Sequence, residues 1–186
     1  MQFVRSGDKP DNDGKLDLVL AGAGPGSGSG IFISTYLGDG AGSFVLKQNI
    51  DLGDGSLKGN IAVGDFNEDG NLDVAFPHTG METVEAPHIN EILLFFGDDT
   101  GNLEQTASVS AGEEPHTVIT TDFNKDGHLD LAVSNRSDGT VSVFVGDGSG
   151  TFTLSATISV LCPTCLPEER NLGASESSHK RLQAAN

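Results

Sequence analysis

Two nine-residue stretches of this chain place oxygen-bearing side chains at every second position, a spacing that suits a bound cation. They are residues 65–73 (DFNEDGNLD, loop 2) and residues 122–130 (DFNKDGHLD, loop 3). Calcium takes six to eight oxygen ligands and favours carboxylates together with a backbone carbonyl. A glycine follows the third oxygen in each stretch, where the chain must turn sharply if the ligands are to converge. The chemistry that these residues indicate is calcium binding.

The expected ligands follow from their positions in each loop. Oxygens at positions 1, 3, 5 and 9 can converge with the carbonyl at position 7 when the chain turns at position 6. In loop 2 these are Asp65, Asn67, Asp69, the carbonyl of Asn71, and Asp73; in loop 3 they are Asp122, Asn124, Asp126, the carbonyl of His128, and Asp130. The alternative is a pair of Asp/Asn-rich turns that hold no metal.

A degenerate copy, loop 1, precedes them in residues 7–17 (GDKPDNDGKLD). Counting back from Gly14 puts Lys9 at position 1, so Asp8 could replace it only if one extra residue bulges out. The candidate ligands here are Asp8, Asp11, Asp13, Lys15 at the carbonyl position, and Asp17. A third calcium site and a metal-free turn both stay open for this loop.

An EF-hand or a dockerin-type loop shares the first nine positions with loops 2 and 3. Position 12 distinguishes such a loop from one that joins two strands. An EF-hand requires a bidentate glutamate there. Position 12 is Phe76 in loop 2 and Val133 in loop 3, each within an apolar, β-branched run. We therefore expect these loops to join strands rather than helices.

The loops belong to an internal repeat. Gly14, Gly70 and Gly127 recur at spacings of 56 and 57 residues. A second marker follows each loop as a Gly-Asp hairpin, in residues 36–44, 95–103 and 144–152. Two markers in a fixed order, three times over, indicate a repeat array.

Each repeat contains four short segments that are rich in β-branched residues and are bounded by Gly, Asp and Asn, which predicts strands. The predicted strands are residues 3–7, 16–21, 31–37 and 44–52, then 59–65, 72–76, 89–96 and 103–109, then 116–122, 129–134, 141–145 and 152–160. Several are apolar at both alternating positions, as in residues 92–96, which favours a sheet packed on both faces.

The fold class expected is all-β: three four-stranded blades of a β-propeller, with the acidic loops between strands 1 and 2 of each blade. The blades would span about residues 1–56, 57–112 and 113–160, and residues 161–186 would form a polar, disordered tail. A closed propeller has at least four blades, so we expect an incomplete, open arc, completed by oligomerisation or by the remainder of a longer chain.

Residues 64–74 (GDFNEDGNLDV) resemble the FG-GAP/VCBS repeat, which is found in integrin alpha-chain propellers and in many secreted or surface proteins. The Gly-Asp hairpins belong to the same repeat, and the resemblance covers about residues 1–160. It implies structural calcium and an extracellular or cell-surface location, with proteins, carbohydrates or matrix as partners. It does not imply one function.

Composition and charge argue against several other classes of function. A formal charge of −17 argues against nucleic acid and against an anionic membrane surface. No apolar run is long enough to span a bilayer, and residues 1–6 have no apolar region of the kind a signal peptide needs. Cys162 and Cys165 form one pair without the further ligands that zinc needs within the chain, so a local disulfide or two free thiols is expected.

Strand parity places the acidic loops and the Gly-Asp hairpins at one end of the blades. The other loops, residues 77–90, 112–116 and 135–138, would lie at the opposite end, and loops on a rigid scaffold are where recognition usually occurs. The candidate partner-binding residues there are His78, Glu82, Glu85, His88, His116 and Arg136. Residues 135–137 also form a glycosylation sequon.

No nucleophile and base stand in a recognisable arrangement, so we expect no catalytic residues in this chain. The leading hypothesis is a non-enzymatic, calcium-stabilised propeller segment for recognition or adhesion. A lectin-type propeller is an alternative, although one Tyr and no Trp offer few platforms for sugar stacking. An accessory propeller of a larger secreted enzyme is another.

Overall fold

The computed structural model describes residues 2–5, 13–23, 30–56, 59–80 and 89–160, and these form twelve β-strands with no helix among them. The strands are β1 (Gln2–Arg5), β2 (Leu18–Ala23), β3 (Gly30–Gly38), β4 (Phe44–Ser56), β5 (Ala62–Gly64), β6 (Asp73–Gly80), β7 (Asn90–Gly97), β8 (Leu103–Ser110), β9 (Pro115–Thr121), β10 (Asp130–Asn135), β11 (Thr140–Gly146) and β12 (Phe152–Ser159).

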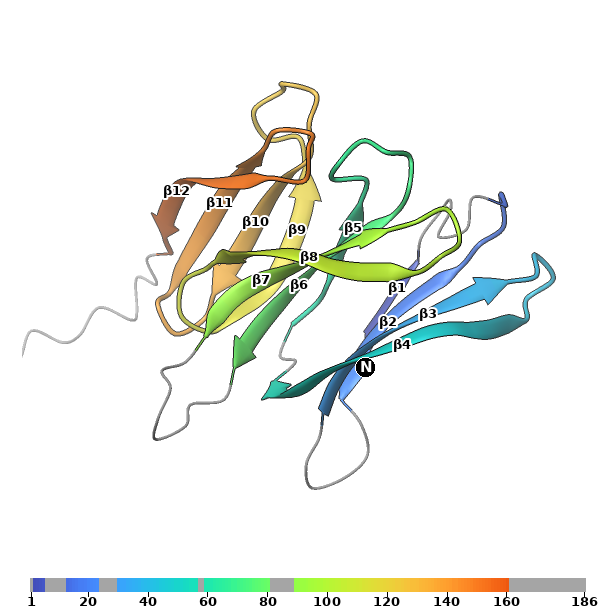
Figure 1. Cartoon of the computed structure of the whole chain (residues 1–186). Helices are drawn as coiled ribbons and strands as arrows, with labels where there is room; N and C mark the ends of the chain where they lie inside the picture. Colours follow the sequence, from blue (N-terminus) through green and yellow to red (C-terminus); the bar gives the residue numbers. More distant parts are fainter. Residues whose placement is uncertain (1, 6–12, 24–29, 57–58, 81–88, 161–186) are drawn as a thin grey trace, which may run out of the picture.

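The strands form three antiparallel groups in which each strand pairs with its neighbour in sequence (Figure 1). We name these sheet 1 (β1–β4), sheet 2 (β5–β8) and sheet 3 (β9–β12). Sheets 1 and 2 are also tied by two residue pairs, Gly55 with Gly80 and Ser56 with Thr79, at the far ends of β4 and β6. The all-β, propeller-like fold that the sequence predicts is confirmed.

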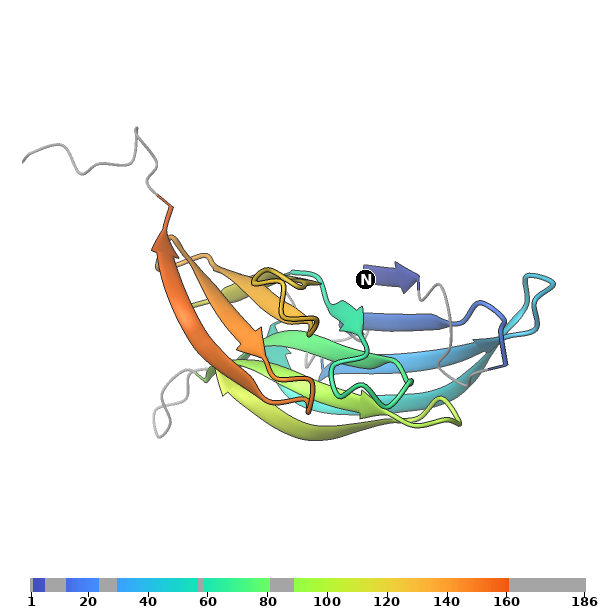
Figure 2. The same ribbon diagram turned by 90° about the horizontal axis from the view of Figure 1, so that it is seen from above.

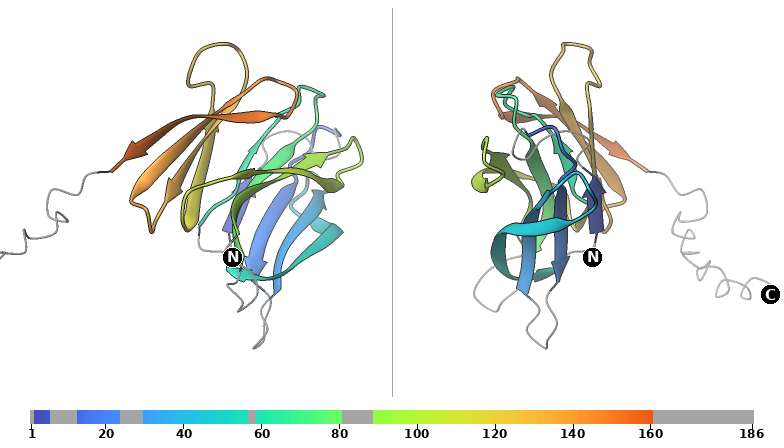
Figure 3. Two further views of the ribbon diagram at one scale, coloured as in Figure 1. Left: turned by 60° about the vertical axis from the view of Figure 1, so that its left-hand side comes forward. Right: turned by 90° about the vertical axis from the view of Figure 1, so that its right-hand side faces the viewer.

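Sheet 2 lies between the other two sheets, as Figures 2 and 3 show from three further directions. Its strands are apolar at successive positions because both faces are covered. Leu93 and Phe95 of β7 pack in a cluster with sheet 1, whereas Ile92 and Leu94 pack in a cluster with sheet 3. The expectation of a sheet packed on both faces is therefore correct.

The outer strands of the three sheets are the most exposed. In β8 and β12, almost every residue after the first is exposed. Their first residues, Leu103 and Phe152, are nevertheless buried in the two core clusters. The core of the molecule thus consists of two layers between sheets rather than one centre.

One predicted boundary is wrong. Residues 77–90 were expected to form a loop, but β6 continues through Pro77 and His78 to Gly80, and β7 begins at Asn90. Pro77 pairs with Ile92 on one side, while the short strand β5 pairs only with residues 73–75 of β6 on the other side. Proline is tolerated at this point because its missing N–H lies beyond the reach of the β5 ladder.

Within the described residues, the structure has no helix that is long and apolar enough to cross a membrane.

Candidate metal centre

Loop 2 joins β5 to β6 and is folded around its own carboxylates. The backbone N–H of Asp69 donates to both Asp65 Oδ1 and Asn67 Oδ1, each at 3.1 Å, so these two oxygens lie close to one point. The N–H of Gly70 donates to Asp65 Oδ2 at 2.9 Å, and that of Asn71 donates to Asp69 Oδ1 at 2.7 Å. The side-chain oxygens of positions 1 and 3 therefore both face the backbone N–H of position 5.

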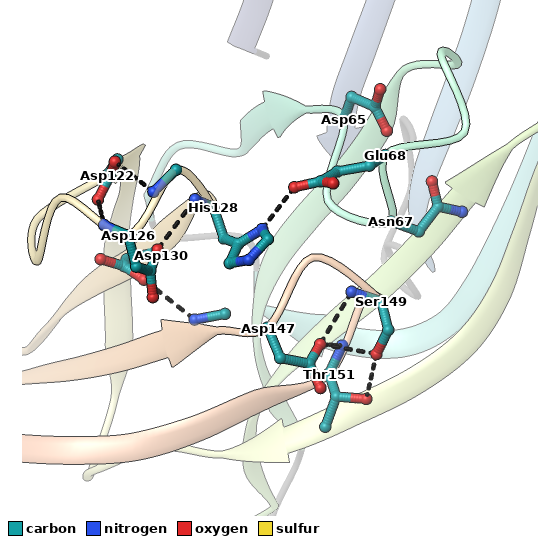
Figure 4. A network of polar contacts seen from close by, with 12 residues as sticks. Asp65, Asn67, Glu68, Asp122, Asp126, His128, Asp130, Asp147, Ser149 and Thr151 are labelled. Atoms are coloured by element: carbon teal, nitrogen blue, oxygen red, sulfur yellow. Dashed lines mark hydrogen bonds and ion pairs between the residues drawn. The ribbon is translucent and has the colours of Figure 1, made fainter.

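Loop 3 joins β9 to β10 and repeats this pattern (Figure 4). The N–H of Asp126 donates to Asp122 Oδ1 at 3.2 Å and to Asn124 Oδ1 at 2.9 Å. The N–H of Gly127 donates to Asp122 Oδ2 at 2.9 Å, and that of His128 donates to Asp126 Oδ1 at 2.9 Å. Two loops with different residues at positions 4 and 7 thus adopt the same hydrogen-bonded turn.

Left-handed backbone conformations make the turn. Gly70 and Gly127, at position 6, have φ of 88° and 96°, as expected. Glu68 and Lys125, at position 4, also have positive φ, 59° and 65°, which the sequence does not reveal. A left-handed residue other than glycine is strained by roughly 1–2 kcal/mol, so the bonds to the first aspartate must hold it.

The aspartate at position 9 links each loop to the next hairpin. Asp73 is fully buried, and its Oδ2 accepts from the N–H of Phe66 at 2.7 Å while its Oδ1 accepts from the N–H of Gly97 at 2.9 Å. Asp130 does the same with Phe123, at 2.8 Å, and Gly146, at 3.0 Å. This residue therefore joins the first turn of its loop to the third strand of the same sheet.

Burial raises the pKa of Asp73 to about 6, against the opposing effect of the hydrogen bonds from Gly97 and Phe66. The charges of Asp69 and Asp65 add to the increase. A carboxyl with a raised pKa among like charges is a group whose ionised form a nearby cation would favour.

The glycine whose N–H donates to the position 9 aspartate has a steric role that sequence reasoning missed. A Cβ on Gly97 would lie 2.3 Å from the carbonyl oxygen of Leu72, at position 8 of loop 2. A Cβ on Gly146 would lie 2.2 Å from that of Leu129, and one on Gly38 would meet that of Leu16 at 1.9 Å. The recurring Gly-Asp pair was a signal for this packing, but it indicated only a hairpin.

The aspartate after that glycine closes each hairpin. Asp98 Oδ1 accepts from the N–H groups of Thr100 and Asn102 at 2.9 and 3.0 Å, and Asn102 Nδ2 donates to Oδ2. The bond from the Asn102 side chain, followed by those from Thr100, holds the pKa of Asp98 well below its usual range. The pKa of Asp39 and of Asp147 is also lowered, chiefly by the bonds from Ser43 and Ser149 respectively.

Loop 1 is described only from Asp13 onward, so Asp8 and Asp11 lie outside the described residues. Asp13 accepts from the N–H of Lys15 at 2.8 Å, as position 5 does in the other loops. The Lys15 ammonium also bonds to Asp13 Oδ2. Asp17 is buried and accepts from the N–H of Gly38 at 2.7 Å. The second half of loop 1 therefore follows the common pattern, with a lysine charge at its position 5 carboxylate.

Loops 2 and 3 contact each other across the boundary between sheets 2 and 3. The His128 ring lies 2.5 Å from Glu68 Oε1 and points toward it (Figure 4). That bond raises the pKa of His128. Below it, the N–H of Gly150 donates to the carbonyl of Phe66, and the rings of Phe66 and Phe152 meet edge to face at 5.5 Å.

The donor set of loops 2 and 3 fits a hard divalent cation in its chemistry. Each loop offers carboxylate oxygens at positions 1, 5 and 9 and an amide oxygen at position 3, which are ligands that calcium favours. In the described part of the chain, no group of three or more His, Cys, Asp or Glu side chains is placed to hold a metal ion as it stands. The loop carboxylates instead accept bonds from their own backbone.

The candidate partner-binding residues are scattered. His78 lies in β6 with a side chain that is only 12% exposed, 3.7 Å from Glu91 Oε1. His116 is half-buried at the start of β9, next to Thr117. Arg136 is 68% exposed and lies 3.6 Å from Glu114 Oε2. Glu82, Glu85 and His88 lie outside the described residues.

The glycosylation sequon is not accessible. Asn135 is 1% exposed, and its Nδ2 donates to Thr140 Oγ1 and Ser142 Oγ at 2.9 and 2.8 Å. The nitrogen that would carry a glycan is therefore buried and already bonded.

The comparisons agree with this architecture. A family model described as an FG-GAP-like repeat matches residues 11–76 and 122–164. No curated protein matches the chain. FG-GAP repeats are typical of extracellular or surface proteins. The matched segments contain loops 2 and 3, β5 before loop 2, β10 after loop 3 and the hairpin of sheet 3, and on this basis the chain belongs to the FG-GAP-like repeat family.

Proposed function

We propose that this chain is a calcium-stabilised segment of a β-propeller, with three blades in an open arc, and that it serves recognition or adhesion outside the cell. The observation that carries the calcium proposal is the identical turn of loops 2 and 3. In both, oxygens of positions 1 and 3 accept from the N–H of position 5. The residues at positions 1, 3, 5, 6 and 9 are the same in both loops, and the side-chain oxygens of positions 1, 3, 5 and 9 are ligands that calcium favours.

The role of calcium in this proposal is structural. The position 9 aspartate is bonded to a buried glycine N–H of the third strand, so a cation that organises the loop also fixes the hairpin. Asp65, Asn67, Asp69, the Asn71 carbonyl and Asp73 would hold one ion. The equivalent residues of loop 3 would hold the second, and loop 1 remains a candidate for a third.

The first test is thermal unfolding with calcium and with a chelator. At a calcium concentration one hundred times Kd, each occupied loop adds about 2.7 kcal/mol to the free energy of unfolding. For a chain of this size that is a rise of roughly 5–10 °C in Tm for each loop. Asp69→Asn should remove about half of the calcium effect, whereas Glu68→Gln, at a position that is not a ligand, should retain it.

A transition that is the same in calcium and in chelator would contradict the calcium proposal. A calcium effect that Asp69→Asn leaves intact would move the site away from loop 2.

The proposed partner surface is the end of the sheets opposite the acidic loops. Arg136 supports this choice because its side chain is 68% exposed there. Binding of surface-attached matrix proteins and glycans should fall in Arg136→Glu and persist in Lys47→Glu, which makes the same charge change on the exposed strand β4. Equal loss in both variants would point to overall charge rather than to this end of the molecule.

A further inference from the structure

The two interfaces inside the molecule are built from equivalent positions of the repeat. One set of positions faces the next sheet, and a second set, on the opposite face, faces the previous sheet. Between sheets 1 and 2 these sets are Val19 and Ile33 against Val74, Phe76 and Phe95; between sheets 2 and 3 they are Ala75, Ile92 and Leu94 against Leu131, Val133 and Phe144.

The outward face of sheet 3 repeats the first set. Ala132, Val141 and Val143 occupy the positions of Ala75, Ile92 and Leu94. Ala132 pairs with Val143 and with Ile119, so these three side chains share one face, opposite to that of Leu131 and Val133. Ile119 is 52% exposed there. An apolar surface that is buried at the equivalent place in sheet 2 is thus open in sheet 3.

The outward face of sheet 1 repeats the second set. Leu18, Leu20 and Tyr36 occupy the positions of Val74, Phe76 and Phe95. Leu18 pairs with Tyr36, and both point away from the face that Val19 presents to sheet 2. All three side chains are half-buried. The two ends of the molecule therefore carry the two complementary halves of its own internal interface.

We propose that a second copy of this chain covers both ends. Sheet 3 of each copy packs on sheet 1 of the other, which gives a closed ring of six sheets with a two-fold axis. This inference rests on the open arc in the proposed function and names what completes it. A ring of six lies within the four to eight blades that propellers use, and closure removes the open sheet faces.

The second copy is favoured because the contact continues an interface that the chain already forms twice. A head-to-tail contact is heterologous, and it either closes or polymerises. Two copies form a closed ring through two identical contacts, and formation of one contact brings the surfaces of the other together. The segment 161–186 of the same chain is less suited to this face, since its only large apolar residues are Leu161, Leu166, Leu172 and Leu182.

The acidic loops supply a charge test of the same contact. Between sheets 2 and 3, position 4 of one loop (Glu68) pairs with position 7 of the next (His128). At the proposed junction the equivalent pair is Lys125 and Lys15 of the second copy, which repel each other. Lys125→Glu would replace this repulsion with the arrangement seen inside the molecule, and it should tighten the association about two- to tenfold at low salt.

The experiment is sedimentation velocity of the full chain in calcium over a wide range of concentration. The expected species has twice the 19.3 kDa mass of the chain. Ile119→Asp puts a charge into the proposed contact at an exposed site, so the fold should persist while Kd rises at least about a hundredfold. Val45→Asp, a change of the same kind at a residue that is 72% exposed on β4, should leave the mass unchanged.

Three outcomes would overturn the inference. A monomer at every concentration excludes the second copy, and a dimer that appears only after removal of residues 161–186 shows that this segment is the occupant. Larger species that grow with concentration, or a dimer that Ile119→Asp leaves intact, exclude the two-copy ring. None of these outcomes bears on calcium, because the chelator-dependent Tm is measured separately and its loss alone would reject the metal sites.

Discussion

At the scale of single residues, the position 9 aspartate explains how a surface turn is fixed to the interior. Asp73 and Asp130 are fully buried, yet each carboxylate accepts one N–H from its own loop and one from the third strand of its sheet. Asp17 accepts the same bond from Gly38. This residue is thus required by the packing of every sheet, whether or not a cation adds to its interactions.

Gly97→Ala tests the close contact that this bond requires. The added Cβ would lie 2.3 Å from the Leu72 carbonyl, a backbone atom that cannot move aside easily, so we expect a loss of about 2–4 kcal/mol in the free energy of unfolding. Gly70→Ala is the matched comparison. A Cβ there meets nothing within 4 Å, and the φ of 88° alone should cost about 1–2 kcal/mol.

Urea denaturation at saturating calcium measures both values. If Gly70→Ala proved the more damaging, backbone strain rather than steric contact would dominate in these turns.

The sequence predicts the glycines at position 6 of the acidic loops, but not the glycines that lie against a loop carbonyl. Gly70 and Gly127 could be found because position 6 of an acidic loop is defined by its neighbours in the chain. The role of Gly97 depends on a carbonyl 25 residues earlier, and its φ is not left-handed, so no local pattern marks it. Likewise, the positive φ of Glu68 and Lys125 comes from the convergence of the loop and not from a residue type that favours it.

At the scale of elements, side chains that pair with backbone hold neighbouring sheets together. Asn60, just before β5, donates through Nδ2 to the carbonyl of Val118 at 3.1 Å and accepts from its N–H at 3.0 Å. Gln48 on β4 makes the same pair of bonds with Leu103, at 3.1 and 2.7 Å. In each case the side-chain amide bonds both the N–H and the carbonyl of one residue, as a residue of an adjacent strand would.

Asn60→Ala tests this link. It would leave the N–H and carbonyl of the fully buried Val118 without the bonds that Asn60 supplies, and we expect a loss of about 2 kcal/mol. Thr106→Ala on the exposed strand β8 should change stability by less than about 0.5 kcal/mol. Chemical denaturation measures the free energy of unfolding of the two variants. Equal values for Asn60→Ala and Thr106→Ala would show that Asn60 has no structural role.

The order of the strands was the most predictable part of the fold, whereas the ends of β4, β5 and β6 differ from the prediction. Residues 92–96 of β7 are apolar at successive positions because neighbouring sheets cover both faces, and this pattern can be recognised in a single sequence. Residues 77–90 were expected to form a loop, and a proline such as Pro77 cannot donate to a ladder. The strand nevertheless continues, because β5 ends its pairing before Pro77 and β4 pairs with β6 only from Thr79 onward. Pairing lengths of this kind are set by neighbours that are distant in sequence.

At the scale of the whole molecule, the formal charge is −17, and hydrogen bonds from nearby side chains and backbone N–H groups stabilise some of its carboxylates. Each sheet carries one hairpin aspartate, Asp39, Asp98 or Asp147, whose pKa is lowered in the folded state by hydrogen bonds. Their contribution to stability is fully present above the unfolded pKa of about 3.9 and is lost as the pH falls through the lower, folded values. The three hairpins should therefore act together in acid unfolding.

Asp98→Asn isolates one of these contributions. We expect it to lower Tm at pH 7 and to lower it progressively less as the pH falls below about 4. At low pH the wild-type Asp98 carboxylate becomes protonated and loses the stability that its ionised form contributes. Glu104→Gln, which removes one negative charge from the exposed strand β8, serves as the control for overall charge. A Tm difference for Asp98→Asn that is constant with pH would show that hydrogen-bond geometry, and not ionisation, is what the hairpin uses.

The two-layered core has a consequence for synthesis of the chain. The inner face of sheet 1, with Val19 and Ile33, is covered by residues of sheet 2 that include Phe76 of β6 and Phe95 of β7, and β7 ends at Gly97. Sheet 1 is complete at Ser56, about 40 residues earlier, and ribosomes add roughly 5–20 residues per second. For roughly 2–8 seconds each nascent chain therefore exposes a finished but uncovered apolar sheet. This interval, repeated at the second interface, is when the protein is most open to chaperones and to pairing with the wrong neighbour.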